Sequence, residues 1–297
     1  MAERPKREVI VFHKADDIKK FNPYHGSDGK FTTGAKATSF TYKPGAGSKY
    51  TSAIKREKER MQMPKNRTVS ECKNFDELDE TLKKRYFFSE GIDASVKRDC
   101  DFEMVKEFSV GFSKIMDKHP NMRGFVDVLD TYPAAISGTT GRILSVNPKF
   151  FSDRDAMDKE IKQQIEQKNT PSNTTIEAIG AHEGAHCLVF AMLFGRDDLE
   201  SVDEIRSAWD SGLIPNEIVT KAEEKVKNTP ECKGKTTEQL RSEISLYALQ
   251  NNDETVAEAY ADINANGKNA KPLSKQIEKE IDGIADDLLK YFQRYEE

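Results

Sequence analysis

The chain has 297 residues, of which 36% are hydrophobic and 33% are charged, so it is long enough for one large domain or two small ones. No stretch approaches 18 uncharged apolar residues, and the first residues are charged. The four cysteines lie far apart without a CxxC pair, so a disulfide framework is not indicated. We therefore expect no membrane association and no secretory leader, and a soluble protein made in the cytoplasm.

Charge is distributed unevenly along the chain. Residues 1–70 hold 16 Lys and Arg against 7 Asp and Glu, a net charge of +9, which leaves −14 for residues 71–297. Within the basic segment, residues 21–53 combine several glycines with few aliphatic side chains, so they cannot bury enough apolar surface to offset their ordering entropy. We predict a flexible basic N-terminal arm over 1–70. Such an arm would attract nucleic acid or an acidic partner surface, or would serve only as a solvated linker.

Hydrophobic periodicity predicts two amphipathic helices where the packed region begins, near Asn74. Apolar residues recur at helical spacing from Phe75 to Phe87 and again from Phe102 to Met116. Further along, short apolar runs rich in β-branched residues at 124–129 and 141–150 predict two or three strands. This part of the chain is therefore expected to combine helices with a small sheet.

Five further helices are predicted in the second half of the chain. Residues 155–168 have a charged amphipathic pattern, and Thr174 or Thr175 can cap a helix that contains the apolar run from Ile176 to Phe194. Helical patterns resume over residues 218–226, 237–264 and 273–295. We therefore predict an α+β domain over residues 71–297, mostly helical with a small mixed sheet.

The most informative motif lies within that apolar run and reads His182-Glu183-Gly184-Ala185-His186. On an α-helix, a spacing of four residues places both imidazoles on one face, where they can occupy two corners of a tetrahedral zinc site. Glu183 follows the first histidine, so its carboxylate can reach an activated water without being a ligand, as a general base requires. The alternative is a structural pair of histidines whose hydrogen bonds are satisfied within the fold.

A zinc site of this kind needs a third protein ligand. The segment from Tyr247 to Asp262 contains four acids, of which Glu254, Glu258 and Asp262 follow one another at intervals of four residues. If the segment is one helix, Tyr247 and these three acids lie near one face, because the successive separations are seven, four and four residues. The acids would then form a solvated surface, or they would supply one ligand together with the groups that support it.

The two motifs together resemble the zinc peptidase domain of the anthrax toxin lethal factor superfamily, whose members are zincins with glutamate as the third ligand. The resemblance covers about 20 residues at each motif. It implies a zincin-like fold and a Zn²⁺-dependent endopeptidase that hydrolyses a protein or peptide substrate. The roles that it implies are metal ligation by His182, His186 and Glu254, general base catalysis by Glu183, support of the site by Glu258, and assistance to the oxyanion by Tyr247.

A thermolysin-like register is the competing interpretation. In that register Glu258 is the ligand, and Asp262, four residues later, bonds to the first histidine. We favour Glu254 because only that register also accounts for Tyr247. The upstream strand at 141–148 fits a zincin sheet beside the motif helix, in which an edge strand pairs with an extended peptide substrate.

Residues 21–33 resemble short segments of bacteriophage head-associated and portal-adjacent proteins. This resemblance predicts a phage or prophage product of the bacterial cytoplasm or the phage virion, whose basic arm contacts phage head components or DNA. Two alternatives remain open: a non-catalytic, head-associated structural protein on a zincin-like scaffold, and a protease effector or toxin that acts on a host protein. A scaffold alone would not need Glu183.

Overall fold

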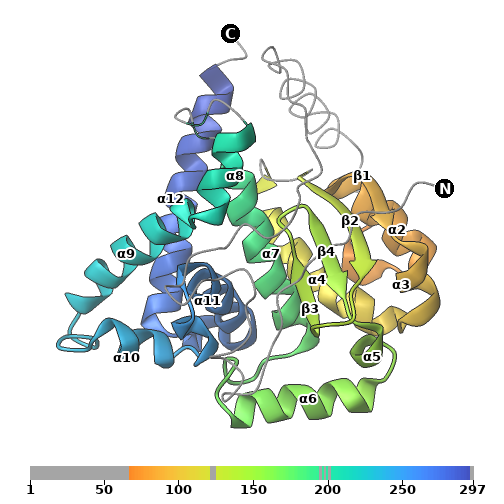
Figure 1. Cartoon of the computed structure of the whole chain (residues 1–297), viewed down its shortest axis with the longest axis horizontal. Helices are drawn as coiled ribbons and strands as arrows, with labels where there is room; N and C mark the ends of the chain where they lie inside the picture. The colour runs from red at the N-terminus through yellow and green to blue at the C-terminus, as the bar shows by residue number, and fades with distance from the viewer. Residues whose placement is uncertain (1–66, 121–124, 194–195, 197–198, 200–201, 295–297) are drawn as a thin grey trace.

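The computed structural model describes residues 67–120, 125–193, 196, 199 and 202–294, so all but the last four residues of the predicted arm lie outside it. Within the described ranges, no helix has both the length and the apolar composition needed to cross a membrane. Figure 1 shows the elements in chain order. The helices are η1 (Val69–Glu71), α2 (Phe75–Arg85), α3 (Ala94–Asp99), α4 (Phe102–Lys118), α5 (Pro148–Phe151), α6 (Arg154–Glu166), α7 (Ile176–Leu193), α8 (Val202–Asp210), α9 (Leu213–Lys227), α10 (Thr237–Ser242), η3 (Tyr247–Leu249), α11 (Asn252–Asn266), η4 (Gly267–Asn269) and α12 (Pro272–Arg294).

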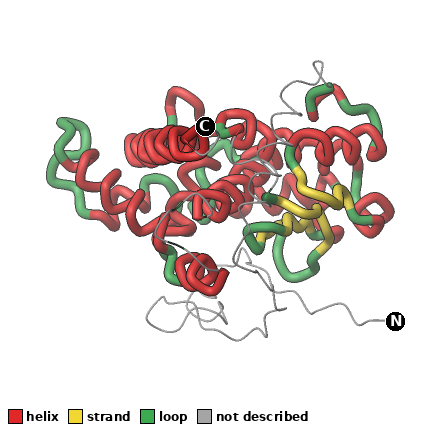
Figure 2. The backbone as a smooth tube through the Cα atoms, turned by 90° about the horizontal axis from the view of Figure 1, so that it is seen from above, coloured by secondary structure: helices red, strands yellow, loops and turns green. Residues whose placement is uncertain are grey.

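The strands form one four-stranded mixed sheet with the order β1-β2-β4-β3. Their bounds are Phe87–Ile92 for β1, Val126–Thr131 for β2, Ser137–Thr139 for β3 and Ile143–Val146 for β4. β1, β2 and β4 are parallel, whereas β3 runs antiparallel to β4, with Ser137 opposite Val146. Figure 2 shows the strands gathered on one side of a largely helical molecule. The prediction of an α+β fold, mostly helical with a small mixed sheet, is confirmed at this level.

The first strand was not predicted from the sequence. Phe87, which the apolar periodicity assigns to a helix, begins β1, because α2 ends at Arg85 and Tyr86 leaves the helical conformation with φ −129°. Later in β1, Gly91 has a φ of +145°, and a Cβ there would lie 1.9 Å from Oδ1 of Asp79. This close approach of strand and helix requires glycine.

The strand predicted at 141–150 is shorter than expected and lies inside the sheet. It ends at Val146, because the Asn147 side chain accepts a hydrogen bond from the backbone nitrogen of Lys149 and Pro148 begins α5. β4 pairs with β2 on one side and with β3 on the other. The predicted strand is therefore not the edge strand that would pair with an extended peptide, because β3 occupies that edge.

The helix predicted over residues 237–264 is interrupted twice. It divides into α10, η3 and α11, because Asn251 is extended (φ −164°, ψ 177°) and caps a new helix. Thr236 caps α10 in a capping box with Gln239. The helices expected near residues 102–116, 155–168, 218–226 and 273–295 are present as α4, α6, α9 and α12, and α8 was not predicted.

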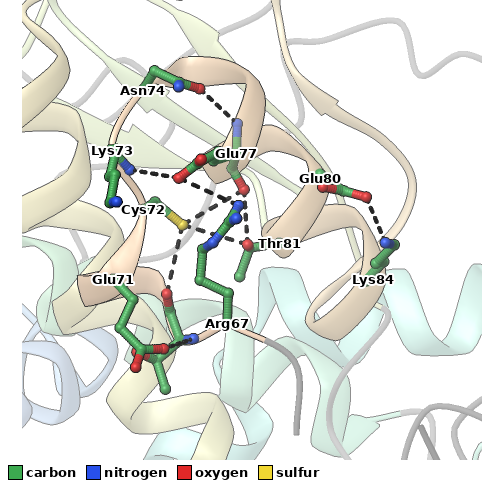
Figure 3. A network of polar contacts seen from close by, with 10 residues as sticks. Arg67, Glu71, Cys72, Lys73, Asn74, Glu77, Glu80, Thr81 and Lys84 are labelled. Atoms are coloured by element: carbon green, nitrogen blue, oxygen red, sulfur yellow. Dashed lines mark hydrogen bonds and ion pairs between the residues drawn. The ribbon is translucent and has the colours of Figure 1, made fainter. Parts of the chain in front are cut away.

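The described chain begins with a small polar network that anchors α2 (Figure 3). The side chain of Asn74 accepts a hydrogen bond from the backbone nitrogen of Glu77 at 3.0 Å, which caps the helix. The carboxylate of Glu77 also lies 3.3 Å from the guanidinium of Arg67. The buried thiol of Cys72 contacts Oγ1 of Thr81 at 3.4 Å. The sequence pattern predicts that the packed region begins near Asn74. In the structure it begins several residues earlier.

The helix that carries the histidine motif, α7, lies at the centre of the fold. Figure 1 shows it between the sheet and α11, and it packs against α4, α8, α9, α11 and β3. All of its side chains except Glu177 and Phe190 are buried. A helix that is apolar on all sides is stable only when it is covered on all sides, which explains why this run of the sequence lacks an amphipathic pattern.

Glycines allow α4 and α7 to touch backbone to backbone. A Cβ at Gly180 of α7 would lie 1.9 Å from the backbone oxygen of Phe108 in α4. A Cβ at Gly111 of α4 would lie 1.8 Å from the backbone oxygen of Glu177 in α7. Real Cβ atoms do not approach this closely, so both positions require glycine. The glycines thus set the depth at which α7 is buried.

We predict that Gly180→Ala destabilises the protein by about 1–3 kcal/mol, because the added methyl group forces the two helices apart. Alanine is otherwise the better helix former, by about 1 kcal/mol. The matched control is Gly283→Ala on α12, where nothing lies within 4 Å of the new Cβ. Urea unfolding of both variants measures the difference. Equal stability of the two variants would contradict the backbone contact.

Candidate metal centre

The middle of α7 presents His182, Glu183 and His186 in the interior, where each is at most 3% exposed. The helix begins directly after Thr175, whose Oγ1 accepts a hydrogen bond from the backbone nitrogen of Ala178 at 3.2 Å. Thr175 is therefore the cap that the sequence placed at position 174 or 175. With the helix start set in this way, the histidines lie one turn apart and both face α11.

The start of α11 supplies the first acid of the site. Asn251 caps the helix by accepting a hydrogen bond from the backbone nitrogen of Glu254 at 2.8 Å, so the cap also sets the position of Glu254. The hydroxyl of Thr255 donates to the backbone oxygen of Ala248 at 2.7 Å. That bond ties η3, which begins at Tyr247, to the first turn of α11.

Three potential ligand atoms converge where α7 meets α11. Oε2 of Glu254 lies 3.4 Å from Nε2 of His182 and 3.5 Å from Nε2 of His186. These separations exceed those of ordinary N–H···O hydrogen bonds, and the buried Oε2 has no hydrogen-bond partner among the described residues. Ligand atoms about 2.05 Å from a tetrahedral centre lie about 3.3 Å from one another. The two distances from Oε2 therefore fit ligands of a shared metal ion, and all three ligand atoms lie within 4.8 Å of one another.

Within the described residues, this is the one group of three or more His, Cys, Asp or Glu side chains whose ligand atoms all lie within 4.8 Å of one another. Its three members are buried. His182, His186 and Glu254 thus form a buried cluster that could hold a metal ion.

The outer nitrogen of each histidine faces a carboxylate of α11. Nδ1 of His182 lies 2.9 Å from Oε1 of Glu258, and Nδ1 of His186 lies 3.2 Å from Oδ2 of Asp253. Contacts of this kind select the tautomer and hold the ring plane, which leaves Nε2 of each ring to face the cluster. Glu258, for which the resemblance implies a supporting role, thus lies against His182, whereas the contact of Asp253 was not predicted.

Asp262 lies apart from the histidines. Its carboxylate accepts hydrogen bonds from the Ser274 hydroxyl at 2.6 Å, the backbone nitrogen of Lys271 at 2.7 Å and the Asn266 side chain at 2.8 Å. Asp262 therefore joins α11 to the start of α12. The thermolysin-like register requires this aspartate on the first histidine, where the structure places Glu258 instead.

Glu183 points from α7 toward the edge strand of the sheet. The Ser137 hydroxyl, at the start of β3, donates a hydrogen bond to Oε1 of Glu183 at 2.7 Å, and both residues are buried. Burial raises the pKa of Glu183, and the neighbouring imidazolium charges of His182 and His186 oppose that rise. The carboxylate is thus held in a fixed orientation beside the cluster rather than as part of it.

Tyr247 packs against the cluster from η3. Its ring centroid lies 6.1 Å from that of His182, and the side chain is buried. Burial and the nearby charges of Glu254 and Glu258 raise the pKa of Tyr247 well above its usual value. The phenol therefore stays protonated at neutral pH and remains able to donate a hydrogen bond.

Without a metal ion, the cluster is a buried network of ion pairs. Burial disfavours charge on His182, but its close contacts with Glu254 and Glu258 outweigh this effect and raise its pKa to about 9. The pKa of His186 is raised well above its usual value, because the charges of Asp253 and Glu254 likewise outweigh burial. Burial alone would raise the pKa of Glu254, yet the two imidazolium charges lower it to about 2. A metal ion would take the place of the protons that hold the imidazoles in the charged state.

Comparisons with known proteins find no match: no protein-family model, no curated protein and no solved structure matches this chain. The likeness to the lethal factor superfamily thus rests on the two motifs.

Two residues that contact the site, Asp253 and Ser137, were not predicted from the sequence. Asp253 directly precedes Glu254, so its place in the first turn of α11 was a usable signal, whereas nothing local to Ser137 indicates its contact with α7.

The raised histidine pKa values predict that metal affinity rises with pH. Both imidazoles must lose a proton before Nε2 can bind a metal, so below about pH 9 protons compete with the metal for His182. Apparent zinc affinity should increase by about tenfold per pH unit for each proton displaced. Competition with a chelator at about pH 6, 7 and 8 measures this slope. An affinity that does not change over that range would contradict the cluster as the binding site.

Proposed function

We propose that this protein is a zinc-dependent endopeptidase whose metal ion is held by His182, His186 and Glu254. The observation that carries the proposal is the convergence of three buried ligand atoms within 4.8 Å of one another, with the carboxylate of Glu183 beside them on the helix of the two histidines. A purely structural histidine pair would not require a buried carboxylate oxygen from α11 to face Nε2 of both rings at more than hydrogen-bond distance.

Zinc is the metal that this set of donors suits best. Two imidazole nitrogens and one carboxylate oxygen are a common ligand set of catalytic zinc sites, which leave the fourth position open. All four cysteines are free thiols, and none belongs to the cluster. When bound, a zinc ion supplies Lewis acidity, because it lowers the pKa of a coordinated water and polarises a carbonyl group.

The protein's own contribution to the chemistry begins with Glu183. As general base, its carboxylate accepts a proton from the attacking water and passes it to the leaving amine. Burial raises the pKa of the Glu183 carboxyl. A higher pKa makes the group a better proton acceptor from water, as a general base requires. The hydrogen bond from Ser137 holds the carboxylate in one orientation, which leaves less motion to be restricted during the reaction.

Tyr247 is the proposed donor to the oxyanion. Its phenol is protonated and lies in the buried site beside His182, so it can donate a hydrogen bond to charge that develops on the substrate carbonyl. A positioned donor of this kind stabilises the transition state by about 3 kcal/mol.

The resemblance to the lethal factor superfamily supports the same assignment. That resemblance predicts Glu254 as ligand and Glu258 as its neighbour one turn later, and both acids face the motif histidines from α11. We propose a zincin-like fold on this basis. The substrate class that follows is a protein or an extended peptide. The basic arm, whose partner we propose to be DNA or a phage head component, lies mostly outside the described residues.

The test compares zinc-loaded wild type with Glu183→Gln and His182→Ala on an unstructured protein substrate and a peptide library. Glu183→Gln should keep about one zinc per chain and lose at least about 100-fold in cleavage rate, because the water loses its base. His182→Ala should lose both zinc and cleavage. The control is Glu238→Gln, which changes an exposed carboxylate on α10 in the same way and should leave both unchanged.

Two results would overturn the proposal. Full cleavage by Glu183→Gln would remove that residue from the reaction. Zinc bound by the wild type without any cleavage would indicate a non-catalytic scaffold instead.

A further inference from the structure

We propose that Asp253 is a positioning residue of the metal centre, which fixes the ring of His186 so that Nε2 faces the ion. Oδ2 of Asp253 lies 3.2 Å from Nδ1 of His186, and both side chains are buried. The motif resemblance assigns no role to this residue, so the inference comes from the contact alone. It rests on the metal site of the proposed function and not on peptide hydrolysis.

The contacts around the two rings form a repeating arrangement. Glu254 faces Nε2 of both rings, Glu258 faces Nδ1 of His182, and Asp253 faces Nδ1 of His186. Each imidazole therefore has a carboxylate of α11 facing each of its two nitrogens. Because Asp253 and Glu254 are adjacent in the first turn of α11, the same turn supplies both partners of His186.

The cost of burying the Asp253 carboxylate must be offset by a specific contact. Asp253 is 7% exposed, and its second oxygen, Oδ1, is buried without a hydrogen-bond partner among the described residues. Burying an acid is unfavourable unless a partner offsets the loss of hydration. The partners that the structure offers are His186 and the N-terminal end of α11, which attracts negative charge. The contact with His186 is thus the one side-chain contact the structure shows that offsets the burial of this acid, alongside the helix end.

The consequence for metal binding is an ordered ligand. The carboxylate of Asp253 facing Nδ1 favours the tautomer with the proton on Nδ1 and the lone pair on Nε2, the atom that faces Glu254. Asp253 and Glu258 therefore have parallel tasks, one for each histidine. Loss of either carboxylate should leave the three ligands in place but allow one ring to rotate or to take the wrong tautomer.

The experiment measures zinc affinity by chelator competition, together with the visible absorption of the cobalt-substituted protein, for wild type, Asp253→Ala and Asp253→Asn. Asp253→Ala should weaken zinc binding by about 10–100-fold and should change the cobalt spectrum, since the geometry around the ion changes. Asp253→Asn should weaken binding less, because the amide oxygen can still accept from Nδ1. The cobalt spectrum is the decisive readout, since a loss of stability alone would not alter it.

A matched control separates this role from helix stabilisation. Asp155 also lies in the first turn of a helix, α6, but is exposed. Asp155→Asn removes a comparable charge from a helix N-terminus and should leave zinc affinity and the cobalt spectrum unchanged. Unfolding of the metal-free proteins in chelator shows how much of any loss comes from the fold.

The outcomes are distinguishable from those of the peptidase test. Zinc affinity of Asp253→Ala within about twofold of wild type, with the same cobalt spectrum, would overturn the proposal. If Asp253→Ala does not fold, Asp253→Leu, which fills a similar volume and also removes the acceptor, replaces it, and an unchanged affinity and spectrum in that variant would overturn the proposal. A wild type that binds zinc but cleaves nothing would leave the role of Asp253 intact. A wild type that binds no zinc would remove this role together with the metal site.

Discussion

The backbone contact between α4 and α7 is the constraint on which the site depends. Gly180 and Gly184 face α4, and at about 100° per residue the two histidines of the motif point to the opposite side of α7, toward α11. Glu183 lies between these directions and reaches Ser137 on β3. One helix therefore has three tasks on three faces, and any change in its depth against α4 would move the ligands relative to α11. The central glycine of the motif serves packing rather than chemistry, since a Cβ there would lie 3.3 Å from the backbone of Phe112.

Much of the helical framework could be predicted because its signals are local. Apolar periodicity located α4 and α12 closely, and Thr175 marked the start of the motif helix. The histidine pair and the acids of α11 were predictable for the same reason, since spacings of four residues decide which side chains share a helix face. Glu254 and Glu258 could be assigned to the site from the motif, although the prediction of one continuous helix over residues 237–264 was wrong.

The remainder depends on contacts between distant segments. Phe87 fits a helical pattern and a strand pattern equally well, and its pairing with Val126 decides in favour of the strand. β3 has only three residues, so nothing in its composition indicates an edge strand, and its Ser137 meets Glu183 across 46 positions of sequence. Tyr247 stays beside His182 despite the break before α11, because Thr255 ties η3 to that helix. Such placements follow from packing, which no local pattern encodes.

The most direct test of the central claim is zinc K-edge X-ray absorption on the full-length protein loaded with one equivalent of zinc. The account predicts a first shell made only of nitrogen and oxygen at about 2.0–2.1 Å, with the outer-shell scattering of two imidazoles. This result would correspond to His182, His186 and a carboxylate around one ion. A sulfur ligand at about 2.3 Å, or scattering from fewer than two imidazoles, would contradict the site formed by α7 and α11.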